Sequence, residues 1–272
     1  MKKDINVRYC TIDSLRGVAA LSVVIFHLYG ALKDDVISWF PSFLASIFSS
    51  GYLGVPIFFV LSGFVISLSV GNARATPKYI LNFAFRRSLR LDPPYWIAIF
   101  IALCLIYFKS IFLGLDFEIP TVDGIIAHLF YLQDILLYDP KISVVYWTLC
   151  LEIQFYLVFV FIIAISQSLL IKQKFSEGLK LFLLLLLGVG SLLIDYEIIG
   201  LEINGFFLKY WHFFLIGILA QLGIKAGRSY QLLFVAWLII ECSMLATFYL
   251  KSYIIAAVLT GGFIFYAGIR GK

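Results

Sequence analysis

Charge is scarce in this sequence. Only 14% of the 272 residues are charged, whereas 62% are hydrophobic, and the mean hydropathy is +0.99. A soluble domain of this length does not need so much apolar surface, so the composition excludes an ordinary soluble protein. The apolar runs are about 20 residues long, which is enough to cross a bilayer as helices and too long for barrel strands.

Cysteine and histidine are also rare, with four and three copies. The cysteines lack the spacing of a metal site or a disulfide framework, and we interpret them as small packing residues. The N-terminus has a basic start and an apolar run but no small-residue cleavage site, which indicates an uncleaved first span rather than a signal peptide. We expect no metal. The four cysteines are Cys10, Cys104, Cys150 and Cys242.

The apolar runs predict an all-α membrane bundle of about eight spans, forming a single transmembrane domain over residues 1–272. We place the spans at about residues 13–31, 51–70, 93–109, 147–171, 179–195, 205–224, 230–250 and 253–269.

Basic residues gather on one side of this arrangement. When the spans alternate through the membrane, 16 of the 21 basic residues fall on the side of the termini. By the positive-inside rule both termini are predicted to be cytoplasmic, and the net charge of +5 reflects topology rather than a nucleic-acid partner. The 16 residues are Lys2, Lys3, Arg8, Arg16, Arg74, Lys78, Arg86, Arg87, Arg90, Lys172, Lys174, Lys180, Lys225, Arg228, Arg270 and Lys272.

Two polar side chains stand eleven residues apart on the first span, Arg16 and His27. Eleven residues make about three helical turns and about 16 Å of rise, so both should project from one helix face. A neutral imidazole accepts a proton near physiological pH, and an Arg suits a phosphate or carboxylate. Asp13 lies three residues before Arg16 and could pair with it. The alternative role for His27 is hydrogen bonding between helices.

An arginine cluster lies in the connection between the second and third spans. Pro77 favours the start of a short helix, and Asp92 followed by Pro93 resembles the cap and start of the third span. On the short helix Arg86, Arg87 and Arg90 are three or four residues apart and could converge on one anionic ligand. The alternative is a cluster that sets topology and binds lipid headgroups.

Glu152 is a further ionisable side chain within an apolar span, where such groups are energetically costly. It lies about five residues into the fourth span, roughly 8 Å below the outer surface and at a depth comparable to that of His27. The two could form an acid/base pair, with Tyr156 one turn beyond the carboxyl. The alternative is a structural carboxyl kept protonated by apolar surroundings. The acidic outer connection, about residues 110–146, could shape a pocket.

Two further polar residues in later spans receive structural interpretations. Glu241 has no obvious partner in the sequence and is interpreted as packing glue, and His212 as an interfacial anchor. The small residues of the second span, between Gly51 and Gly63, favour close helix packing, and the alternative is a groove for a thin acyl or pantetheine chain.

Five segments together resemble the membrane-bound acyltransferase-3 family. Residues 12–17 (IDSLRG) followed by His27 resemble its first-span signature, an Arg and, after ten residues, a His. The other four segments are residues 54–64 (GVPIFFVLSGF), residues 86–95 with the arginine cluster, residues 147–156 (WTLCLEIQFY) and, more weakly, residues 212–217 (HFFLIG).

The resemblance implies transfer of an acyl group, most often acetyl, from cytoplasmic acyl-CoA to a hydroxyl of a cell-surface polysaccharide, such as lipopolysaccharide O-antigen, or of another glycan or glycolipid. His27 would be the base or be acylated, and Glu152 would orient it. Arg16, Asp13 and Tyr156 would support the site. Arg86, Arg87 and Arg90 would bind acyl-CoA, with no permanently bound cofactor. The implied location is the bacterial cytoplasmic membrane, in contact with its lipids.

This sequence departs from the family in two respects. Thr148 stands where Ser is commoner. The family usually has ten spans, so we expect the last two to be lacking here, together with the soluble hydrolase-like domain of some relatives. Two other functions therefore stay open. One is a truncated inactive chain that acts as an interaction partner, and the other is a small-solute or proton-coupled transporter using the same His, Arg and Glu.

Overall fold

A computed structural model describes residues 2–32, 34–37, 39–70, 76–114, 120–138, 142–168, 173–201, 203–248 and 250–270, without the side chains of 2–11, 34–35, 113, 168 and 173–174. Cys10 and part of the basic pattern lie outside the described residues or side chains, namely Lys2, Lys3, Arg8, Arg74, Lys172, Lys174 and Lys272.

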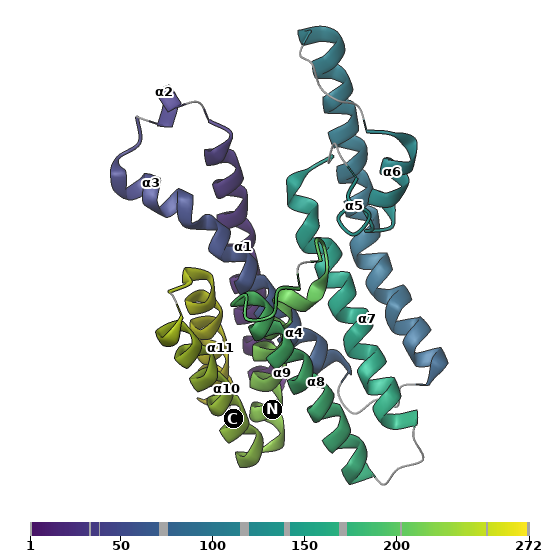
Figure 1. The fold of residues 1–272 in the computed structure, drawn as a ribbon, viewed down its shortest axis with the longest axis vertical. Helices are drawn as coiled ribbons and strands as arrows, with labels where there is room; N and C mark the ends of the chain where they lie inside the picture. The colour runs from purple at the N-terminus through teal and green to yellow at the C-terminus, as the bar shows by residue number, and fades with distance from the viewer. Residues whose placement is uncertain are drawn as a thin grey trace. The chain divides into compact units, whose positions relative to one another are not determined.

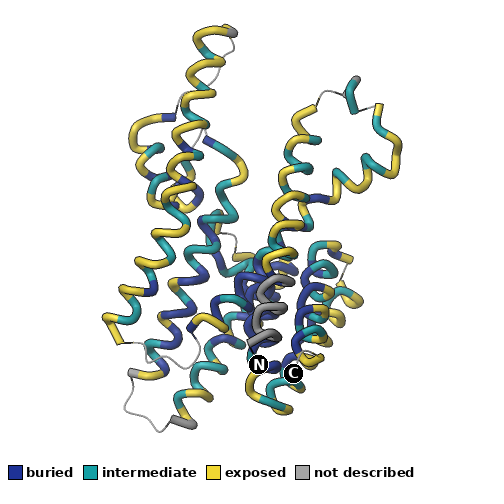
Figure 2. Tube along the Cα trace, turned by 180° about the vertical axis from the view of Figure 1, so that it is seen from behind, coloured by how far each residue is buried: buried dark blue, intermediate teal, exposed yellow. Residues whose placement is uncertain are grey.

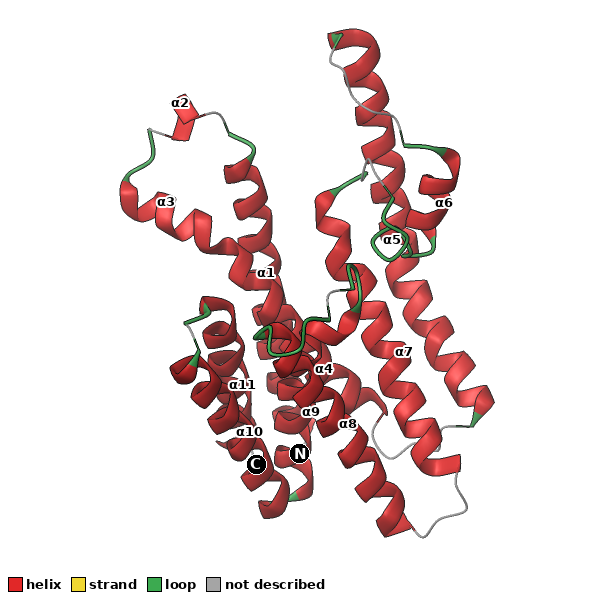
Figure 3. Ribbon diagram, in the orientation of Figure 1, coloured by secondary structure: helices red, strands yellow, loops and turns green. Residues whose placement is uncertain are grey.

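All regular structure in the described residues is helical (Figures 1 and 3). Within the described residues, eight helical segments are long and apolar enough to cross a membrane, which confirms the predicted polytopic bundle. The elements are α1 (Lys2–Gly30), α2 (Asp34–Ile37), α3 (Ser42–Ser49), η1 (Ser50–Leu53), α4 (Gly54–Val70), α5 (Pro77–Leu113), α6 (Val122–Leu129), η2 (Val144–Tyr146), α7 (Trp147–Ser168), α8 (Gln173–Asp195), η3 (Phe207–Tyr210), α9 (Trp211–Ala226), α10 (Arg228–Thr247) and α11 (Ser252–Arg270).

The chain forms two compact units, described separately below. Unit 1 comprises residues 1–71 and 210–272, with α1, α4, α9, α10 and α11 as its long helices. Unit 2 comprises residues 72–209, with α5, α7 and α8.

Helix α9 forms the centre of unit 1 and is buried along nearly its whole length (Figure 2). Its backbone approaches that of α4 very closely. A Cβ added to Gly217 would lie 1.9 Å from the carbonyl oxygen of Val60, and one added to Gly63 would lie 2.0 Å from that of Phe214. Only glycine fits there, which confirms close packing by the small residues of the second span.

Unit 2 corrects one prediction, because α5 is a single helix that continues through Pro93 and Pro94. Its predicted start is right, since Thr76 caps it through Tyr79 N at 3.2 Å and Pro77 occupies the first turn. Asp92 is not a helix cap.

Tertiary contacts on both sides of the prolines account for the uninterrupted helix. The Asp92 carboxylate accepts hydrogen bonds from the Ser88 hydroxyl and, at 2.8 Å, from the Tyr131 hydroxyl. Tyr95 stacks on Tyr131 with ring centroids 4.6 Å apart, and Trp96 donates to the Leu129 carbonyl at 3.3 Å. These contacts offset the two backbone donors that the prolines remove.

Candidate active site

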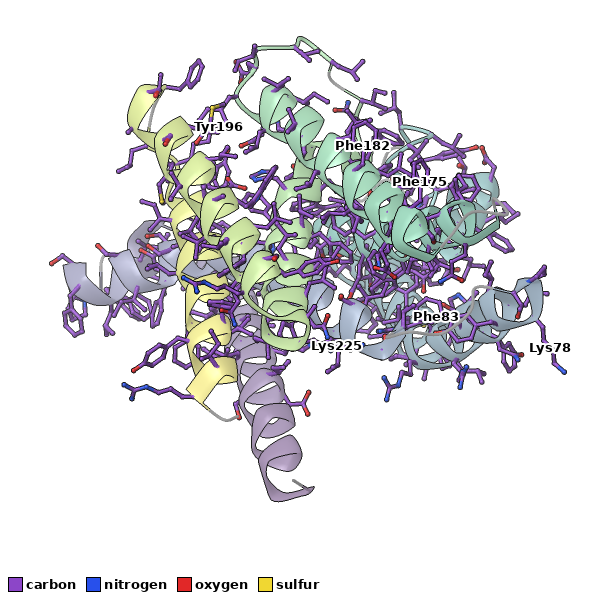
Figure 4. The ribbon with its side chains drawn as sticks, turned by 90° about the horizontal axis from the view of Figure 1, so that it is seen from below. Lys78, Phe83, Phe175, Phe182, Tyr196 and Lys225 are labelled. Atoms are coloured by element: carbon purple, nitrogen blue, oxygen red, sulfur yellow. The ribbon has the colours of Figure 1, made fainter. Side chains whose placement is uncertain are left out.

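Arg87 of α5 lies against Tyr156 of α7, in unit 2. The guanidinium carbon is 4.5 Å from the centre of the Tyr156 ring, and Nη1 donates to its hydroxyl at 3.4 Å. Phe83, one turn earlier on α5 and labelled in Figure 4, places its ring centre 5.6 Å from the same carbon. The guanidinium is thus held between two aromatic faces, a favourable cation–π arrangement.

This position differs from the predicted one. The sequence places Arg87 in a connection between spans, but it lies within α5 and beside the tenth residue of the 22-residue helix α7. A charged group opposite the middle of an apolar helix is costly and is typical of a functional site.

Tyr156 joins Arg87 to Glu152. Its hydroxyl donates a hydrogen bond to Glu152 Oε1, one turn away on α7. Arg87, Tyr156 and Glu152 therefore form one hydrogen-bonded line, the Arg87–Tyr156–Glu152 line. Three of the residues singled out in the sequence meet here, and their proximity was predictable only for the two on α7.

A pocket of about 580 Å³ opens beside this line, between α5 and α7. Tyr131, from the long connection before α7, also lines it. Burial, and next its hydrogen bond to Asp92, raise the pKa of Tyr131, so it stays a protonated donor. The walls are mostly apolar and consist of Ile80, Phe83, Ala84, Arg87, Ser88, Leu91, Asp92, Tyr131, Ile153, Tyr156, Leu157, Val158, Val160 and Phe161.

The other two arginines of the cluster do not line this pocket. Arg86 is exposed, and its Nε donates to the Asn82 carbonyl of its own helix at 3.1 Å. Arg90 is exposed as well. Convergence of all three arginines on one ligand stays a prediction.

The first-span residues lie in unit 1. Arg16 and His27 share the continuous helix α1, as predicted, and both are partly exposed. The His27 ring meets the Phe26 ring edge-on at 5.2 Å. Among the described side chains no ion pair joins Asp13 to Arg16. Because His27 belongs to unit 1 and Glu152 to unit 2, their acid/base pairing stays a prediction.

The structure pairs two residues that the sequence interpretation kept apart. His212 Nδ1 of α9 lies 3.1 and 3.3 Å from the carboxylate oxygens of Glu241 of α10, and Trp237 Nε1 donates to the same carboxylate at 3.0 Å. His212 and Glu241 are both 0% exposed. The contact agrees with Glu241 as packing glue and gives it a partner that the sequence did not reveal, whereas the interpretation of His212 as an interfacial anchor is wrong. The sequence did carry one signal for this pair. His212 and Glu241 are polar side chains within neighbouring apolar spans, where a polar group without a partner is energetically costly.

Comparison with known proteins decides the family. A family model described as "Acyltransferase domain" (Acyl_transf_3) matches residues 11–270. The chain belongs to the acyltransferase-3 family. No solved structure matches it. Within the described residues, no group of three or more His, Cys, Asp or Glu side chains could hold a metal ion.

Acyltransferase-3 relatives resemble this chain at modest identity. O-acetyltransferase OatA of Staphylococcus aureus (strain NCTC 8325 / PS 47) is 27% identical over 214 residues, covering 70% of this chain and 32% of OatA. Putative O-acetyltransferase SACOL0978 of S. aureus (strain COL) is 28% identical over 201 residues, covering 70% of this chain and 30% of the relative. The chain spans about a third of the length of these relatives.

Proposed function

We propose that this protein is a membrane O-acyltransferase that moves an acyl group from cytoplasmic acyl-CoA to a hydroxyl of a cell-surface polysaccharide or another glycan. The Arg87–Tyr156–Glu152 line beside an apolar pocket is the observation that carries the proposal. Family membership supports acyl transfer, and the relatives' names support acetyl as one such group. We further propose the bacterial cytoplasmic membrane as its location.

In this scheme His27 takes the proton of the acceptor hydroxyl, whose oxygen then attacks the thioester carbonyl. The carbon–sulfur bond breaks, and the CoA thiolate leaves and receives a proton. In a variant of the scheme His27 is acylated first and then passes the acyl group on. Glu152 stabilises the protonated His27.

The arginines act on the donor. Arg87 faces the pocket and would meet the reactive end of the donor, and the exposed Arg86 and Arg90 would meet the CoA phosphates. Arg16, on α1 of unit 1, would supply a further cation, with Asp13 three residues before it on the same helix.

The test uses the full chain, purified and reconstituted in liposomes with labelled acetyl-CoA and a glycan acceptor. We expect acyl transfer and CoA release. His27→Ala should lose at least about a hundredfold of the rate at an unchanged melting temperature, because a general base contributes 10²–10⁴-fold. Leu28→Ala, an exposed neighbour on α1, serves as the matched control.

Solute or proton transport without any consumption of acyl-CoA would overturn the proposal and support the transporter. Full acyl transfer by His27→Ala would overturn the role proposed for His27 and leave acyl transfer itself standing. Comparing glycan O-acetyl content in cells with and without the gene extends the test to the natural acceptor.

A further inference from the structure

The pocket between α5 and α7 is apolar over most of its wall. On α5 the apolar residues include Ile80, Phe83 and Ala84, and on α7 they include Val160 and Phe161. A volume of about 580 Å³ lies within the range of pockets that enclose whole small molecules, about 300–1,000 Å³. An acetyl group, with its single methyl, has no use for such a space.

The polar groups of this pocket are engaged with one another. Ser88 and Tyr131 both donate to Asp92, and Arg87 donates to Tyr156. A ligand segment rich in amides, such as the pantetheine arm of CoA, would bury polar groups against apolar walls at a cost in hydrogen bonds. A hydrocarbon chain has no such cost.

We propose that the pocket holds the acyl chain of the donor and that this chain is longer than acetyl, of about four to eight carbons. The inference rests on the proposed function and names its donor class. The thioester carbonyl then lies beside Arg87 and Tyr156 in the pocket wall, where the guanidinium, which carries five N–H donors, can face a developing negative charge. Each buried methylene strengthens donor binding by about fourfold, equivalent to about 0.8 kcal/mol.

The experiment compares acetyl-, butyryl-, hexanoyl- and octanoyl-CoA as donors for the full chain in liposomes. We expect kcat/KM to rise by at least tenfold from acetyl to hexanoyl. Ala84→Phe fills the pocket from α5 and should lower kcat/KM for hexanoyl-CoA about tenfold, with acetyl-CoA changed by less than twofold.

Matched variants separate chain binding from folding. Leu81→Phe adds similar bulk on the same helix at an exposed position outside the pocket, and both donors should be unaffected. Ala84→Leu, a milder filling, gives the same test if Ala84→Phe lowers the melting temperature. Equal losses for acetyl and hexanoyl would overturn the inference, because the pocket would then hold a part common to all donors.

Four further outcomes are informative. Transfer from acetyl-CoA alone overturns this inference and leaves the proposed function standing, whereas no turnover of any acyl-CoA overturns the proposed function. A photoactivatable hexanoyl-CoA should crosslink to residues 153–161. Crosslinking there by a photoactivatable phospholipid, undiminished by excess hexanoyl-CoA, would show that a membrane lipid fills the pocket and would overturn the inference.

Discussion

Glu241 in unit 1 and Glu152 in unit 2 are both carboxyl groups within apolar helices, yet their surroundings differ. Glu241 is enclosed, with His212 and Trp237 as hydrogen-bonding partners. Glu152 is partly exposed, and its partner Tyr156 lines a pocket. The same residue type is therefore buried in the interior of unit 1 and accessible at the surface of unit 2.

The histidines show the same contrast. His212 is wholly buried beside its carboxylate, whereas His27 is only partly buried and meets aromatic Phe26. Loss of one partner from a buried hydrogen-bonded pair strongly destabilises the fold, because the other polar group stays buried without its partner, whereas a partly exposed group can change its partner during a reaction. The comparison predicts effects on stability in the first case and on turnover in the second.

The largest effect is expected at the closed site. His212→Leu leaves the Glu241 carboxylate buried opposite an apolar side chain, and we expect a loss of about 3–5 kcal/mol, measured by unfolding in detergent. The double variant His212→Leu/Glu241→Leu should regain at least half of that loss, because neither polar group of the pair then stays buried without its partner. If His212→Leu is as stable as wild type, the pair makes no net contribution to the free energy of unfolding.

Glu152→Gln is the counterpart at the pocket. Gln keeps the size and most hydrogen bonds, so we expect an unchanged melting temperature but a loss of about a hundredfold in acyl transfer, equivalent to about 2.7 kcal/mol. Glu152→Asp should keep part of the activity. Glu177→Gln, on the exposed ion pair with Lys180 of α8, is the control. Full activity of Glu152→Gln would make this carboxyl structural, like Glu241.

Gly217→Ala examines the close packing of unit 1. Its Cβ would collide with the Val60 carbonyl, and overpacking of this kind costs about 1–3 kcal/mol. Gly190→Ala on α8 is the matched control, since nothing lies within 4 Å of the added methyl. It should be neutral or stabilising by up to about 1 kcal/mol. Equal melting temperatures for the two variants would show that α4 and α9 can separate without cost.

The smallest effects are expected in the arginine cluster, beginning with Arg87→Lys. It retains the charge but loses the planar group that stacks on Tyr156 and Phe83, so we expect acyl-CoA affinity to fall about tenfold, equivalent to about 1.4 kcal/mol. Arg86→Lys and Arg90→Lys, at exposed positions, should each lose about threefold. Equal losses at all three positions, measured by titration with acyl-CoA, would indicate convergence on one phosphate.

Much of the fold follows from local patterns. The eight spans could be predicted from hydropathy, and the start of α5 from Thr76 and Pro77, because these signals act within one segment. The continuation of α5 through Pro93 and Pro94 could not, because it depends on Tyr131, which is about 40 residues further along the chain.

The same division holds for the candidate site. Glu152 and Tyr156 are one turn apart on one helix, so helical geometry alone places them together. Arg87 reaches Tyr156 from another helix, 69 residues away, and Glu241 reaches His212 across 29 residues. The sequence shows that ionisable side chains in apolar helices are energetically costly, but it does not predict which residues they contact.

By itself, the sequence determined the membrane class, the helices and the family, because composition, periodicity and motif spacing are local properties. The tertiary structure alone decided which polar groups meet, which are enclosed and where a pocket opens. Those outcomes depend on how helices pack side by side. Helix packing brings together residues that are far apart in the sequence, and no local pattern predicts which of them meet.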